Sequence, residues 1–108
     1  MKITVLLFFL MASNTYAGDS LSLALRHLQK HGLSTKNVYL EQQTASSDLY
    51  LSEYTLDRNG HPCHTAVVVN RKSKKIINAN QDPDLSFYYP YTDIFPDPGR
   101  LLVHICAD

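Results

Sequence analysis

The chain has no tryptophan, only two cysteines and no net charge, because ten lysines and arginines balance ten aspartates and glutamates. General nucleic-acid-binding proteins usually carry a basic excess, so this balance argues against a nucleic-acid partner. No apolar run reaches about 20 residues, the length that a stable membrane insertion requires. A length of 108 residues allows one domain, and the mixture of 44% apolar and 19% charged residues excludes a disordered charged tail. We therefore expect a small globular domain.

Residues 1–17 have the composition of an export signal, with a lysine at position 2 followed by a mostly apolar stretch. Thr15 and Ala17 occupy the positions that a signal peptidase recognises, so we expect cleavage after Ala17. The alternative is a buried N-terminal strand or helix. Cleavage would leave a periplasmic or secreted domain over residues 18–108.

The two cysteines, Cys63 and Cys106, are an even number in a chain expected to be exported, which favours a disulfide. For the loop between them, the chain-entropy model gives a stabilisation of about 4 kcal/mol. The alternative is a metal site built from two short clusters, His61-Pro62-Cys63-His64 and His104-Ile105-Cys106. Their spacing differs from that of common zinc sites, and neighbouring residues on a strand point to opposite faces. We expect the disulfide, with no bound metal and no cofactor.

Residues 20–31 are predicted to form an amphipathic helix. Apolar side chains recur at helical spacing along one face, at Leu21, Ala24, Leu25 and Leu28. Ser20 is expected to cap the start of the helix. Gly32 is expected to end it, with Leu33 packing back against the last turn.

Five strand-like segments follow the helix, over residues 37–43, 49–56, 63–70, 76–79 and 101–106, with a polar connection over 44–48. Asp57-Arg58-Asn59-Gly60 contains the Asn-Gly signal of a tight turn, and the three valines at 67–69 predict a central strand. The basic stretch over 71–75 is expected to be a solvated hairpin tip. The pattern predicts an α+β fold, with one N-terminal helix packed on a four- to five-stranded antiparallel sheet. The disulfide would tie the last strand to the central one.

The stretch over residues 67–77 resembles the strand–turn–strand ending of the PepSY-type module, a small exported domain often linked to protease inhibition or regulation. The resemblance includes the leading helix and the segment over 49–56, and it carries no catalytic motif. Asn70 and Lys74 replace the acidic residue and the glycine that are usual in that turn. The resemblance implies a helix-plus-sheet fold and a regulatory role. A cystatin-like fold would show much the same pattern.

Residues 81–99 concentrate prolines, aromatic rings and aspartates, including four of the five prolines in the chain. Prolines at this density exclude a regular helix or a central strand, so we expect a long irregular loop. Aromatic side chains offer a large contact area at low entropic cost. We predict a binding surface for another protein at Phe87, Tyr88, Tyr89, Tyr91 and Phe95. The alternative is that these rings fold over the sheet and complete the core.

The sequence contains no Gly-x-Ser-x-Gly motif, no phosphate-binding glycine loop and no His-Glu-x-x-His motif. An enzymatic alternative is a small secreted nuclease or other hydrolase that uses histidine acid–base chemistry. Its candidate residues are Glu53, His61, His64 and His104. We favour an exported binding protein that inhibits or neutralises another protein, such as a hydrolase or a toxin.

Overall fold

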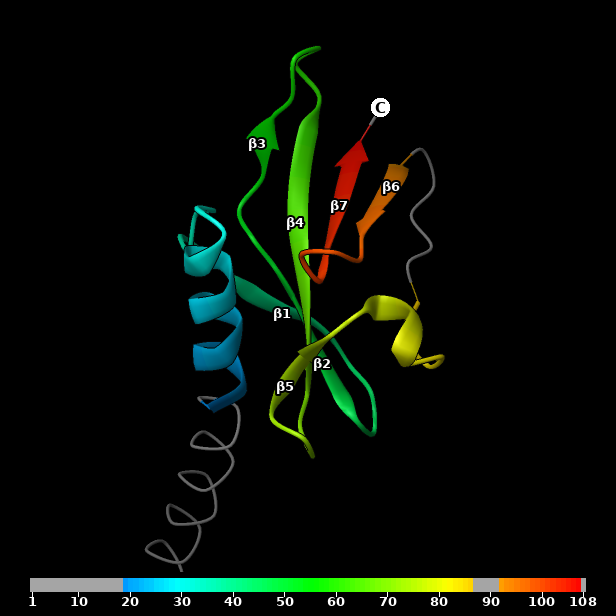
Figure 1. Ribbon diagram of the computed structural model, residues 1–108. Helices are drawn as coiled ribbons and strands as arrows, with labels where there is room; N and C mark the ends of the chain where they lie inside the picture. The colour runs from blue at the N-terminus through cyan, green and yellow to red at the C-terminus, as the bar shows by residue number, and fades with distance from the viewer. Residues whose placement is uncertain (1–18, 87–91, 108) are drawn as a thin grey trace, which may run out of the picture.

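The computed structural model describes residues 19–86 and 92–107, so the predicted export signal and its cleavage site lie outside the described residues. A helix over residues 19–30 packs against a seven-stranded antiparallel sheet (Figure 1). The predicted α+β fold is confirmed. The sheet has more strands than the four or five expected, because one predicted strand is divided in two and the predicted loop contains another.

The sheet is organised around one long strand, β4. The strands are β1 (Tyr39–Gln43), β2 (Ser47–Leu51), β3 (Thr55–Leu56), β4 (Pro62–Asn70), β5 (Lys75–Ile77), β6 (Thr92–Asp97) and β7 (Leu102–Ala107), and a 3₁₀ helix, η1 (Ala79–Gln81), follows β5. The main order is β1-β2-β4-β7-β6, and β3 and β5 also pair with β4. The valines at 67–69 are each 1% exposed, so the prediction of a central strand is confirmed.

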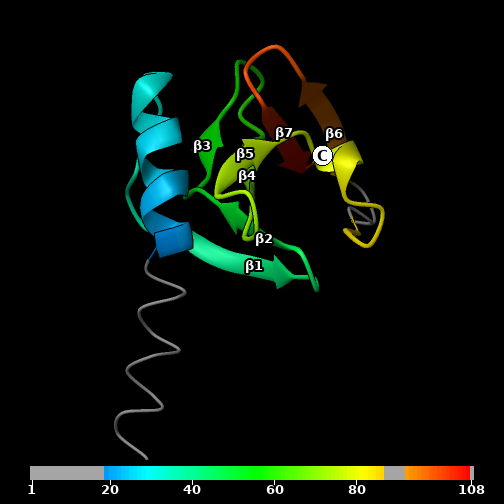
Figure 2. The same ribbon diagram turned by 60° about the horizontal axis from the view of Figure 1, so that its bottom comes forward.

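The helix covers one face of the sheet, which we call the helix face. Ala24 and Leu28 of the helix pack there against Tyr50, Val67 and Val69. Because side chains alternate along a strand, the intervening residues form a second apolar cluster on the opposite face. Its buried members are Leu49, Leu51, Ala66, Val68, Val103 and Ile105. Figure 2 shows the helix and the η1 segment on opposite sides of the sheet, and we call this second face the open face.

The end of the helix follows the sequence prediction. Gly32 has a positive φ of 70°, its N–H donates to the carbonyl of Gln29, and the N–H of Leu33 donates to the carbonyl of Leu28 at 2.9 Å. These two bonds form a Schellman motif, which glycine favours because it lacks a Cβ. The predicted cap at the start is wrong. Asp19 is already helical, so Ser20 lies within the helix, where it is 4% exposed.

Two strand boundaries differ from the prediction. Ser47 and Asp48, expected in a polar connection, are buried residues of β2. The segment over 49–56 is interrupted after Leu51, where the Ser52 hydroxyl accepts a hydrogen bond of 2.8 Å from the N–H of Thr65. Here a side-chain hydroxyl, rather than a backbone carbonyl of the neighbouring strand, accepts the N–H, and regular strand pairing ends.

Strand β6 occupies part of the segment that was expected to be an irregular loop, so this prediction is wrong over residues 92–97. The strand pairs only with β7 and lies at an edge of the sheet. Proline is tolerated in an edge strand, because its missing N–H is not needed on the unpaired side. Pro96 in β6 is therefore compatible with a strand, although it would not be in β4.

Cys63 and Cys106 form the predicted disulfide. They are register partners on the neighbouring strands β4 and β7, with Cα atoms 4.0 Å apart. The bridge thus ties the last strand to the central strand, as expected. Disulfides are typical of proteins in oxidising compartments.

In the part of the chain that the structure describes, no helix has the length and apolar character needed to cross a membrane.

Candidate binding groove

A groove of about 410 Å³ opens between the η1 segment and the hairpin of β6 and β7. We call it the proline groove, because three of the prolines predicted to lie in a loop form part of its wall. Its volume falls within the range of known ligand sites, about 300–1,000 Å³. The lining residues are Asn78, Ala79, Asn80, Asp82, Pro83, Leu85, Ile94, Pro96, Pro98, Leu102 and Val103.

The floor of the groove comes from two neighbouring strands. In the register of β6 and β7, Ile94 pairs with Ile105, and Pro96 pairs with Val103. Ile94 packs against the apolar cluster of the open face, so Pro96, two residues further along the strand, points to the same side. The groove therefore lies on the open face, away from the helix.

The side of the groove that faces the β6–β7 hairpin is a tight turn. The Asp82 carboxylate accepts a hydrogen bond of 3.0 Å from the N–H of Asp84, and the N–H of Leu85 donates to the carbonyl of Asp82. Pro83 lies inside this turn, where its fixed φ suits the second turn position. Gln42 of β1 donates to the carbonyl of Asp84, which ties the turn to the edge of the sheet.

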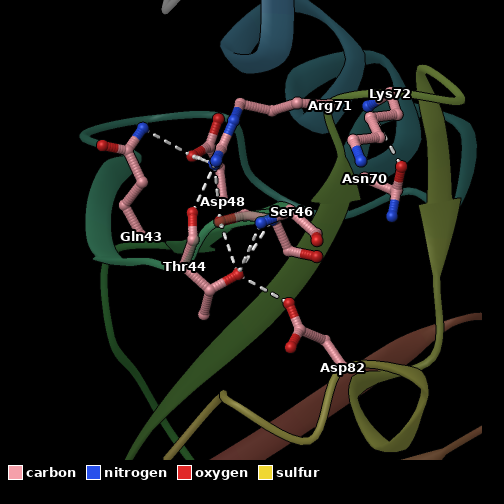
Figure 3. A network of polar contacts seen from close by, with 9 residues as sticks. Gln43, Thr44, Ser46, Asp48, Asn70, Arg71, Lys72 and Asp82 are labelled. Carbon is pink, nitrogen blue, oxygen red and sulfur yellow. Dashed lines mark hydrogen bonds and ion pairs between the residues drawn. The ribbon is translucent and has the colours of Figure 1, made fainter.

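A polar network behind this wall holds the turn in place (Figure 3). The Thr44 hydroxyl donates a 2.6 Å hydrogen bond to Asp82 and accepts from the N–H groups of Ser46 and Ser47. The hydrogen bond from Thr44 holds the pKa of the Asp82 carboxyl below its usual value. Asp82 is therefore a carboxylate at neutral pH, and the turn between β1 and β2 fixes its position.

Arg71 extends the network into the sheet. Its Nη1 lies 2.6 Å from Asp48 Oδ1 and donates to the carbonyl of Ser47, while Nη2 donates to the carbonyl of Thr44. The side chains of Arg71 and Asp48 are only 12% and 1% exposed. Arg71 is therefore not part of the expected solvated hairpin tip, although Lys72, Lys74 and Lys75 are exposed.

The chemistry of the groove suits binding. Eight of its eleven lining residues are alanine, proline, leucine, isoleucine or valine. Asp82 is the charged residue of the lining, which contains no lysine or arginine among the described residues. The described lining also has no histidine, cysteine or serine that could act as a catalytic base or nucleophile. The groove can hold apolar groups and favours a positive charge at its rim.

The predicted aromatic surface is only partly described. Phe87, Tyr88, Tyr89 and Tyr91 lie outside the described residues. Phe95 is 54% exposed, but it is the register partner of His104 and points to the helix face. The structure therefore does not place Phe95 with the lining residues of the proline groove.

The structure does not bring the four candidate acid–base residues together. His64 lines a second hollow of about 190 Å³ on the open face, where its Nδ1 lies 2.8 Å from the carbonyl of Ser52. His104 lies on the helix face, with its Nδ1 3.4 Å from the Thr65 hydroxyl. The other two, Glu53 and His61, contact Asn37 and Asp57 respectively.

The metal alternative from the sequence also lacks its ligands. The sulfur atoms of Cys63 and Cys106 are bonded to each other, so neither is a free thiolate. Asp57 is the other member of a cluster with these sulfur atoms, and it accepts hydrogen bonds from the N–H groups of Asn59 and His61.

Comparison of the chain with models of protein families, with curated proteins and with solved structures found no match. The resemblance to the PepSY-type module stays a prediction.

Proposed function

We propose that the chain is a small exported binding protein that holds an extended, apolar segment of a partner protein in the proline groove. The observation that carries the proposal is the groove itself, an apolar depression of about 410 Å³ on the sheet face that the helix leaves open. Large apolar depressions on monomeric proteins commonly mark interaction sites. The turn at Pro83 and the hairpin at Pro96 and Pro98 restrict the motion of its walls, so little entropy is lost on binding.

The partner we propose carries a lysine or arginine beside its apolar residues. Asp82 lies in the lining, and Asp84, two residues further along the chain, is exposed. Arg100, in the turn between β6 and β7, is paired with Asp97 at 2.6 Å, so its positive charge is largely balanced. A cationic flank on the partner would therefore complement the groove and steer the encounter.

The role we propose is inhibition or neutralisation of a hydrolase or toxin outside the cytoplasm. The disulfide between Cys63 and Cys106 supports export, because such bridges persist in oxidising compartments. The composition of residues 1–17 supports the same location.

Capture from an extract of the source cells tests the proposal. The oxidised chain over residues 18–108 would serve as bait, beside a Leu85→Asp variant that places a charge in the groove. A matched Leu56→Asp variant makes the same change on β3, where Leu56 is 65% exposed and outside the groove. We expect the wild type and Leu56→Asp to capture the same partner, and Leu85→Asp to lose it.

Two results would overturn the proposal. The first is that the wild type captures nothing beyond an empty matrix. The second is that Leu85→Asp, with a native circular dichroism spectrum, captures the partner as well as the wild type does. Leu85 packs partly against the core, so a second variant, Asn80→Lys, changes the exposed rim and leaves the core intact. It should lose the partner as Leu85→Asp does.

A further inference from the structure

Two histidines lie one turn apart on the helix, away from the proline groove. The ring centroids of His27 and His31 are 4.7 Å apart, and the ring planes meet at 71°. Residues separated by four positions project from the same side of a helix. Neither ring belongs to the groove or to the set of histidines considered for acid–base catalysis.

A contact with the β6–β7 turn fixes the orientation of the first ring. Nε2 of His27 lies 2.7 Å from the carbonyl oxygen of Arg100. A carbonyl oxygen only accepts hydrogen bonds, so Nε2 carries the proton and, in the neutral ring, Nδ1 carries the lone pair. Histidines that bind metal ions commonly donate their second ring N–H to a backbone carbonyl in this way. His27 is therefore held as a metal ligand would be.

We propose that His27 and His31 form a binding site for a divalent transition-metal ion. Imidazole nitrogen is a good ligand for Zn²⁺, Ni²⁺ and Cu²⁺. Two histidines at this spacing on one helix face are also the arrangement by which helical zinc motifs hold their ion. No metal was expected here from the sequence, since the metal alternative considered above involved the cysteines.

The surroundings define the kind of site. Leu28 follows His27 where a zinc protease motif has its catalytic glutamate, so the site binds an ion without the base for hydrolysis. No third histidine, cysteine or carboxylate side chain converges on the pair within residues 19–86 and 92–107. Water would therefore complete the coordination. Lys30 adds positive charge nearby, while the charge of Arg100 is largely balanced by Asp97. Mg²⁺ and Ca²⁺ prefer oxygen ligands, so these hard ions are not expected to bind.

Titration of the untagged, oxidised chain over residues 18–108 with ZnCl₂, NiCl₂ and CuCl₂ tests the site. We expect one ion per chain by isothermal titration calorimetry and a rise of the melting temperature with metal concentration, because the ion binds the folded helix. His31→Ala should weaken the affinity at least tenfold. His61→Ala, which removes an exposed histidine on another turn, should leave it unchanged, and MgCl₂ should have no effect.

A spectroscopic measurement locates the ion independently of stability. Substoichiometric Cu²⁺ should broaden the imidazole NMR signals of His27 and His31 before those of His61, His64 and His104. His27→Ala removes the bond to Arg100 as well as a ligand, so His31→Ala is the decisive variant. The proposal fails if the wild type binds none of the three ions, if His31→Ala binds them as the wild type does, or if the broadening is strongest at another histidine.

Discussion

The hydroxyl of Thr44 donates a 2.6 Å hydrogen bond to the carboxylate of Asp82, and this bond joins the polar network at the end of the sheet to the wall of the proline groove. The two residues are 38 positions apart in the chain. The bond therefore positions the turn that carries Pro83 and Leu85 relative to the β1–β2 connection.

Replacing Thr44 by valine should loosen this wall. Valine has nearly the same shape, but it removes the hydroxyl donor to Asp82, which keeps only the N–H of Asp84 among the hydrogen bonds described above. It also leaves two N–H groups, of Ser46 and Ser47, without this acceptor. We expect a loss of about 1–3 kcal/mol in the free energy of unfolding, measured by urea denaturation. Thr55→Val, at an exposed position of β3, is the matched control and should change it by less than about 0.5 kcal/mol. Equal losses in the two variants would contradict the role of Thr44.

The buried pair of Arg71 and Asp48 should respond strongly to the loss of one partner. Arg71→Met leaves a carboxylate that is 1% exposed without its cation, and we expect a loss of about 3–5 kcal/mol in the free energy of unfolding. Lys72→Met, in the same turn but exposed, should cost less than about 0.5 kcal/mol. In a double-mutant cycle, Arg71→Met should cost much less in an Asp48→Asn background. Similar costs in both backgrounds would show that the pair is not coupled.

Acid should destabilise the fold through aspartates that accept hydrogen bonds. The pKa of Asp82 is lowered chiefly by the Thr44 hydroxyl, that of Asp57 by the N–H of His61, and that of Asp97 by the Arg100 side chain. A carboxyl whose pKa is lower in the folded chain stabilises the fold above its unfolded pKa, about 4, and this contribution is lost as the pH falls through the folded pKa. We expect the urea midpoint to fall between pH 5 and pH 2, and to fall less in Asp82→Asn. An identical decline in that variant would exclude a contribution from Asp82.

The disulfide should supply a large part of the net stability of so short a chain. Cys63 and Cys106 are 43 positions apart, and the chain-entropy model gives about 4 kcal/mol for closing such a loop. The double variant Cys63→Ala/Cys106→Ala should therefore unfold at a clearly lower urea concentration than the oxidised wild type. Reduction of the wild type should produce a similar decrease. A decrease of less than about 1 kcal/mol in the free energy of unfolding would show that the antiparallel pairing of β4 and β7 holds the strands without the bridge.

The features predicted correctly depend on local chemistry. Gly32 ends the helix because the positive φ there suits glycine, and the valines at 67–69 mark a strand that is covered on both faces. The cysteine count was sufficient to predict the bridge, although the pairing of Cys63 with Cys106 in one register required the structure.

The features missed depend on contacts between distant segments. In the sequence, Asp48 resembles a loop residue. Its partner Arg71 is 23 positions away, and only folding brings the two side chains together. Strand β6 was hidden because Pro96 argues against a central strand and gives no signal for an edge strand. The groove itself requires η1 to lie beside the β6–β7 hairpin, and no local pattern shows this.

The central claim is that the proline groove holds the partner, and a photo-crosslinker placed at its rim tests this most directly. A benzophenone side chain would replace Asn80 at the rim or, as the control, Leu56 on β3, and each chain would be irradiated in the extract of the source cells. We predict that position 80 forms a covalent adduct with the partner captured by the wild type, and that position 56 does not. An adduct with that partner from position 56 and none from position 80 would contradict the assignment of the groove as the binding site.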